Sequence, residues 1–159
     1  MSAVRRALRA SLRHPADSWL YARMLVWRTL LPLLKFVLPL RTLARLLWTE
    51  PAARVRKPER EARILRLIAR AYRLGQSHDN CLERSLLTYR LLSARNAEPR
   101  LVIGFKKAAE DLEGHAWVLV DGLPVHDSPE FIADFTPLGV FAEGGAVEAP
   151  LRPRPAEAA

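Results

Sequence analysis

The spacing of apolar residues predicts helices in the first half of the chain. Residues 17–48 carry leucine at helical spacing, interrupted by arginine, and predict an amphipathic helical arm. Pro32 and Pro39 are expected to kink or divide this arm, because proline lacks the amide donor of a helix interior. Residues 59–74 repeat the helical spacing until Gly75, which favours a helix end. The first half is therefore expected to be helical.

The run CLERSLLTYRLL predicts a further, buried helix that begins at Cys81. Asn80 followed by Glu83 forms an approximate capping box, so Asn80 is expected to cap this helix. Asn96 ahead of Pro99 indicates its end. The helix thus places Cys81 at its amino terminus.

From residue 100 onward the pattern changes to that of strands. The runs RLVIGFK, HAWVLV and PVHD predict consecutive antiparallel strands, with Asp121 and Gly122 as the turn between the last two. The runs FIADF and LGVFA indicate a further strand or short helix. Residues 143–159 are rich in Pro, Ala and Gly and predict a disordered tail.

The chain of 159 residues is long enough for one ordinary domain. Half of its residues are apolar, so a packed core can form. We expect an α+β fold in which helices precede a small antiparallel sheet. A basic helical arm over residues 1–58 and a core over residues 59–142 would form that one domain.

The net charge of +8 is unevenly distributed. Residues 1–74 hold 17 Lys and Arg against 4 Asp and Glu, a net charge of +13, whereas residues 75–159 hold 8 against 13, a net charge of −5. Solvated helix faces would explain this excess of positive charge. An acidic partner or an anionic membrane surface would also explain it. A membrane would contact residues 17–48. Nucleic acid ranks lowest, because no aromatic residues are interleaved with the arginines.

Cys81 is the only cysteine, which excludes an internal disulfide and fits a reducing compartment, so we expect a cytoplasmic protein, with membrane association as a further option. Five basic residues interrupt the stretch from Trp19 to Trp48, which argues against a transmembrane helix, and no secretory signal is indicated. His78 and Asp79 lie near Cys81, but their spacing matches no known ligand pattern. We expect no metal and no cofactor.

Three residues could together carry nucleophilic chemistry. A helix amino terminus favours the thiolate of Cys81, although a lone cysteine is also common as a small buried hydrophobic residue. His115 opens a predicted strand and could take the thiol proton, or it could be an ordinary surface residue. Asp127 could orient His115 by accepting its other ring proton, or it could simply flank a turn.

Strand geometry tests this assignment. If residues 121–122 formed a two-residue hairpin loop, the pleat would direct Asp127 away from His115, and His126 would share the face of His115 instead. A three-residue loop or a bulge would restore Asp127 to that face. We therefore predict an odd loop or a bulge at this hairpin.

Acyl transfer also needs donors for the oxyanion. The backbone amide of Cys81, at the start of a helix, is the first candidate. The side-chain amide of Gln76 is a candidate for the second donor, although an ordinary polar loop residue is the commoner role, and Asn80 is a weaker candidate.

The order of a helix with an amino-terminal cysteine, a strand, a strand opening with histidine and a strand with aspartate resembles the transglutaminase-like branch of papain-type cysteine enzymes. More narrowly, CLERSLLTYRLL, LVIGF, GHAWVLVDGLPV and the following Asp127 resemble the leader peptidases of lasso-peptide biosynthesis, over roughly residues 15–140. The resemblance implies a papain/transglutaminase-like core and a cysteine endopeptidase with Cys81, His115 and Asp127 as its triad.

That resemblance also implies a substrate and partners. The substrate would be a ribosomal precursor peptide, whose leader is removed before a separate ATP-dependent lasso cyclase closes the core. Residues 1–58 lack the alternating strands of the leader-recognition domain that some relatives carry. A separate leader-recognition protein is therefore implied.

Two other functions stay open on the sequence. A transglutaminase-like transferase would use the same three residues and resolve the thioester with an amine instead of water. A non-catalytic basic adaptor would keep Cys81 merely buried, and Cys81 would then resist alkylation.

Overall fold

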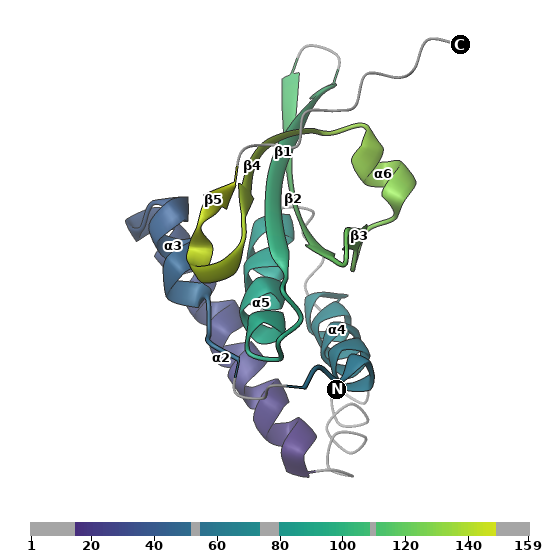
Figure 1. Ribbon diagram of the computed structural model, residues 1–159. Helices are drawn as coiled ribbons and strands as arrows, with labels where there is room; N and C mark the ends of the chain where they lie inside the picture. Colours follow the sequence, from purple (N-terminus) through teal and green to yellow (C-terminus); the bar gives the residue numbers. More distant parts are fainter. Residues whose placement is uncertain (1–14, 52–54, 74–79, 109–110, 149–159) are drawn as a thin grey trace, which may run out of the picture.

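The predicted α+β architecture, with helices first and a sheet second, is confirmed by the computed structural model (Figure 1). The structure describes residues 15–51, 55–73, 80–108 and 111–148. Its helices are α2 (Pro15–Val37), α3 (Leu40–Leu47), α4 (Pro58–Arg73), α5 (Cys81–Ser93), α6 (Pro129–Ala133) and the short 3-10 helix η2 (Glu143–Gly145). Its strands are β1 (Arg100–Ala108), β2 (Asp111–Val120), β3 (Leu123–Pro124), β4 (Thr136–Phe141) and β5 (Val147–Glu148).

The predicted arm forms α2 and α3. Pro39 divides them, as expected, by standing at the start of α3, whereas α2 continues through Pro32. Met24 and Leu31 are fully buried in the core that the helices share with the sheet. None of the helices in the described part of the chain is long and apolar enough to cross a membrane.

Basic residues of α2 help to hold it against the other helices. Lys35 Nζ lies 2.6 Å from a carboxylate oxygen of Glu83 on α5, and Arg28 donates to the carbonyl of Ala71 on α4. The predicted capping box is wrong, because the side chain of Asn80 makes no capping hydrogen bond and Glu83 pairs with Lys35. Glu83 is only 3% exposed, and a buried carboxylate needs a cationic partner.

The sheet has the strand order β3-β2-β1-β4-β5, with antiparallel pairing throughout the described strands. The β1–β2 hairpin is longer than predicted, because its register runs from Arg100 opposite Leu119 to Ala108 opposite Asp111. Of the segment PVHD, only Pro124 lies in a strand, the two-residue β3. Of the two ambiguous segments, FIADF contributes to α6 and LGVFA to β4.

The ordered chain continues past the predicted start of the tail. Residues 143–148 form η2 and β5, so the boundary at 143 was placed too early. The reason is a close approach at Gly145, which has a φ of 70°, and whose added Cβ would lie 2.5 Å from the backbone nitrogen of Arg45 on α3. Only glycine fits this contact. Gly145 therefore allows residues 143–148 to pack against α3 and does not indicate disorder.

The two faces of β2 have different neighbours. Val118 and Val120 belong to the main core with the helices, whereas Trp117 and Leu119 pack in a smaller cluster with residues of and beside α6. This is the alternation expected of a strand. The sheet therefore carries α5 on one face and α6 on the other.

Gly104 on β1 lets the Trp117 ring lie flat across the sheet. An added Cβ would lie 2.8 Å from both the Trp117 ring and the carbonyl oxygen of Thr136. We expect Gly104→Ala to lower the free energy of unfolding by about 1–3 kcal/mol, as overpacking does. Gly114 is the matched control, since nothing lies within 4 Å of its added Cβ. Urea unfolding that gave equal midpoints for Gly104→Ala and Gly114→Ala would contradict this account.

Candidate active site

Cys81 is the first residue of α5, where that helix meets the open edge of β2. Because β3 is so short, it pairs with Leu119 and Val120 and leaves the edge beside Ala116 uncovered. Ser85 on α5 donates to the carbonyl of Ala116 at 2.8 Å, and the Ala116 amide donates to the thiol of Cys81. These two bonds fix the amino terminus of α5 beside the strand that carries His115.

The structure brings Cys81, His115 and Asp127 together. The thiol of Cys81 is hydrogen-bonded to the imidazole of His115. His115 Nε2 lies 3.6 Å from a carboxylate oxygen of Asp127, and the two side chains are only 12% and 11% exposed. Since Nε2 faces the carboxylate, Nδ1 is the ring nitrogen left for the thiol. The geometry is that of a nucleophile, a base and an orienting acid.

The predicted odd loop or bulge in the β2–β3 hairpin is wrong. Asp121 and Gly122 form a two-residue loop with φ angles of 54° and 79°, and Val120 pairs directly with Leu123. Asp127 still reaches His115, because the chain leaves the strand after Pro124 and bends through residues 125–127. The alternation of a strand therefore does not extend to Asp127.

Arg84, which the sequence analysis did not single out, holds Asp127 from the other side. Its Nη2 lies 2.7 Å and 3.0 Å from the two oxygens of the Asp127 carboxylate. Arg84 stands three residues after Cys81, so both side chains project from one side of α5. That spacing, an arginine one turn beyond the cysteine of a buried helix, was the signal in the sequence.

One side of α5 contacts the β3–α6 connection in one further place. Thr88 Oγ1 lies 3.0 Å from His126 Nε2, one turn beyond the contact of Arg84 with Asp127. Burial, together with the positive charge of Arg84, lowers the pKa of His126 to about 4. His126 is therefore neutral near pH 7 and positions the connection rather than joining the charged cluster.

The electrostatics of the cluster favour a thiolate and an imidazolium. Burial raises the pKa of Cys81, but the hydrogen bond with His115 and the amides of Ala116 and Leu82 outweigh burial, and the net shift is downward. The Asp127 carboxylate, 3.6 Å from Nε2, and then the thiol of Cys81 raise the pKa of His115 to about 9. Burial likewise raises the pKa of Asp127, but His115 and Arg84 lower it overall.

Aromatic rings pack around His115. The rings of Phe131 and Phe135 have centroids 5.2 Å from that of His115, and the Trp117 ring lies nearly parallel to it at 6.1 Å. Lys106 lies over Phe135, with Nζ 4.7 Å from the ring centroid. These rings limit both the rotation of the imidazole and the access of water to it.

Of the two side chains proposed as oxyanion donors, only Asn80 lies within the described residues. Gln76 lies outside the described residues. Asn80 directly precedes Cys81, so it is close to the cluster, and the backbone amide of Cys81 is at the start of α5. In the described part of the chain, no group of three or more His, Cys, Asp and Glu side chains could hold a metal ion.

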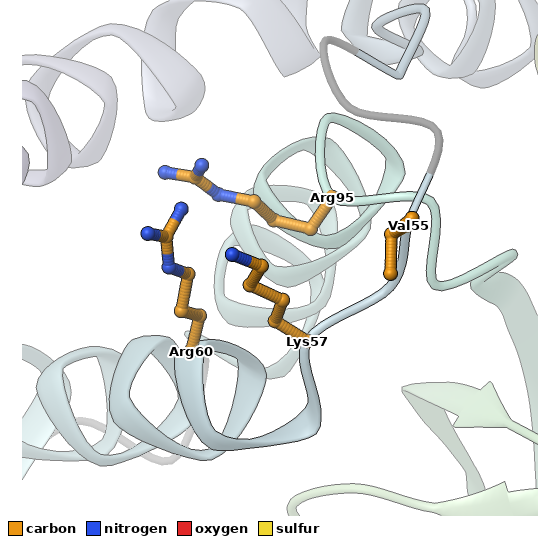
Figure 2. A pocket seen from close by; sticks show the side chains of 4 residues that line it. All are labelled: Val55, Lys57, Arg60 and Arg95. Atoms are coloured by element: carbon orange, nitrogen blue, oxygen red, sulfur yellow. The ribbon is translucent and has the colours of Figure 1, made fainter.

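A separate cavity lies at the far end of α5. Figure 2 shows the side chains of Lys57, Arg60 and Arg95 extending toward the same space, with Val55 beside them. Lys57 directly precedes α4, Arg60 lies in its first turn, and Arg95 follows the end of α5. The rise of a helix puts this cavity roughly 20 Å from Cys81.

Removing the charge of Arg84 is expected to shift the acid limit of activity. Arg84→Gln should raise the pKa of Asp127, because one of the causes that lowers it is lost, so activity should fail at a higher pH than in the wild type. We expect kcat/KM to fall by about 10–100-fold at neutral pH, as when a group that orients a ligand is lost. Arg84→Lys keeps the positive charge but lacks the planar set of guanidinium donors, so its kcat/KM should lie between those of Arg84→Gln and the wild type. The test is a pH profile of kcat/KM, and superimposable profiles for wild type and Arg84→Gln would contradict the role.

Comparison with known families points in the same direction as the geometry. The family model described as the transglutaminase-like superfamily matches residues 21–140, a range that includes Cys81, His115 and Asp127. No curated protein and no solved structure matches the chain.

Proposed function

Because the chain belongs to the transglutaminase-like superfamily, we propose that it is a cysteine peptidase that removes the leader from a ribosomal lasso-peptide precursor. The observation that carries the peptidase proposal is the contact of Cys81 with His115 and of His115 with Asp127, together with the lowered pKa of the thiol. The leader-peptidase specificity rests on the resemblance of the segments around Cys81 and His115 to that group of enzymes.

The proposed reaction begins when His115 takes the proton of Cys81. The thiolate attacks the scissile carbonyl carbon, a C–S bond forms, and the carbonyl oxygen becomes an oxyanion that the Cys81 amide stabilises. His115 returns the proton to the leaving amine as the C–N bond breaks. The leader remains on Cys81 as a thioester and the core peptide leaves with a free amine.

Water resolves the thioester in the second half of the reaction. His115 takes a proton from water, the hydroxide attacks the thioester carbonyl, and the Cys81 sulfur leaves and is reprotonated. The leader departs with a new carboxylate. The free amine of the core is the group that a separate ATP-dependent cyclase would join to an acidic side chain. Asp127 keeps the imidazole oriented through both halves.

Product masses distinguish this reaction from its alternatives. The full chain would be incubated with a cognate precursor, with and without the leader-recognition protein. We expect two fragments whose masses sum to that of the precursor plus one water. A leader joined to an added amine would instead support the transferase, and intact precursor under both conditions would support the adaptor.

We also propose that the cationic cavity of Lys57, Arg60 and Arg95 docks an acidic surface of the leader-recognition protein. Three cations converge there (Figure 2), and within the described residues no ion pair joins any of them to a carboxylate. Arginine is well suited to carboxylates at such interfaces. The distance from Cys81 leaves the site free for the precursor.

Charge reversal at this cavity should weaken the effect of the partner protein. We expect Arg60→Glu to raise the partner concentration needed for half-maximal stimulation by about 10-fold or more, since like charges at an interface cost several kcal/mol. The rate of Cys81 alkylation should stay at the wild-type value. Arg66→Glu, an exposed change on the same helix, is the matched control. Equal effects of the two reversals in a titration of cleavage rate against partner would contradict the docking site.

A further inference from the structure

A second cavity lies on the sheet face that carries α6, and two of the rings that line it, Trp117 and Phe135, pack on His115. It has a volume of about 270 Å³ and is bounded by α6 and by β1, β2 and β4. All the residues that line it are apolar residues, proline or glycine, so it offers no charge to a ligand. The side chains that shape it most are Val102, Trp117, Leu119, Ile132, Ala133 and Phe135.

The cavity shares its wall with the candidate active site. Trp117 lies nearly parallel to the His115 ring with centroids 6.1 Å apart, and the Phe135 ring lies 5.2 Å from it. Both rings also line the cavity. One residue of an extended peptide spans about 3.3 Å. These two rings therefore lie within about two residues' span of His115, so a side chain in the cavity would belong to a residue close to the scissile bond.

We propose that this cavity is a specificity subsite that receives one apolar side chain of the substrate peptide, close to the scissile bond. The inference rests on the proposed peptidase function for its substrate class. The volume lies just below the roughly 300–1,000 Å³ of pockets for small molecules, which suits one aliphatic or aromatic side chain. A charged side chain would lose its hydration there without a partner and is excluded.

Binding tests the subsite without requiring catalysis. The full chain with Cys81→Ala would be titrated with N-acetyl-leucine amide, N-acetyl-glycine amide and N-acetyl-aspartic acid amide, and observed by NMR. We expect the leucine probe to shift the Trp117 indole N–H and the Ala133 methyl, and to bind at least 10-fold more tightly than the other two. Equal affinity for the three probes, or shifts that leave Trp117 and Ala133 unchanged, would overturn the subsite.

Kinetics with a filled cavity tests its link to cleavage. Precursor peptides would carry leucine or alanine at each of the two positions on either side of the scissile bond. We expect wild type to prefer leucine at one position by about 10-fold or more, and Ala133→Leu to abolish that preference. Asp134→Leu adds the same side chain at a neighbouring position that does not line the cavity, and should behave as wild type.

The two measurements separate the subsite from the proposed function. A leucine preference that survives in Ala133→Leu would overturn the subsite while the peptidase function stands. If no peptide is hydrolysed but the leucine probe binds selectively at Trp117, the peptidase function fails and the apolar binding site stands.

Discussion

Replacing Cys81 by alanine is expected to lower kcat/KM for precursor cleavage by about 10⁴-fold or more, because removal of a covalent nucleophile disables both halves of the reaction. The change is small and occurs at a half-buried position, so the fold should persist. The measurement is the initial rate of leader release by mass spectrometry, with precursor affinity determined in parallel.

Thr88→Ala is the matched control for this experiment. It removes one polar group from the same side of α5, and its hydrogen bond with His126, without touching the thiol. We expect it to change kcat/KM by less than about 10-fold, since one hydrogen bond contributes about 1 kcal/mol. Equal rates for wild type and Cys81→Ala, with precursor affinity unchanged, would assign the cleavage to other groups.

Replacing His115 by alanine should raise the pKa of Cys81 and nearly abolish cleavage. Burial by itself raises this pKa, and the hydrogen bond to His115 is the largest cause that lowers it, so loss of His115 moves the pKa upward. In wild type, the iodoacetamide reaction of Cys81 should reach half its maximal rate below the ordinary thiol pKa of about 8.5. In His115→Ala the midpoint of the alkylation profile should move to a higher pH than in the wild type.

The pH range of cleavage follows from the pKa values of Cys81 and His115. The thiolate forms as the pH rises through the lowered pKa of Cys81, and the imidazolium that protonates the leaving amine is lost as the pH rises through about 9. Because the two groups interact, the two pH limits are properties of the coupled Cys81–His115 pair and not of either residue alone. We expect kcat/KM of His115→Ala to fall by about 10³–10⁴-fold, as when a triad member is lost. An alkylation profile unchanged by His115→Ala would contradict the assignment.

Local patterns in the sequence were sufficient to predict the elements that carry the site. A helix beginning at Cys81 and a strand containing His115 follow from periodicity and from turn residues, which act over short distances. The approach of Asp127 was also predicted, but for the wrong geometric reason. A bend after Pro124, not a bulge in the hairpin, brings Asp127 to His115.

Partners that are distant in the sequence explain what could not be predicted. Glu83 was predicted to cap its own helix. It instead forms an ion pair with Lys35, which lies 48 residues earlier and comes close when α2 packs on α5. Arg84 reaches Asp127 across 43 residues. Gly145 belongs to a composition typical of disorder, yet its lack of a side chain allows close contact with α3. Membrane contact through residues 17–48 stays a prediction.

The most direct test of the account is the covalent state of Cys81 during the first turnover. The wild-type chain would be mixed with excess cognate precursor and its leader-recognition protein, quenched in acid at short times and digested for mass spectrometry. We predict that the Cys81 peptide carries the carboxyl-terminal digestion fragment of the leader as a thioester, which adds the mass of that fragment less one water, and that hydroxylamine removes it. Leader release at the full rate from Cys81→Ala, with Cys81 never modified in wild type, would contradict the central claim.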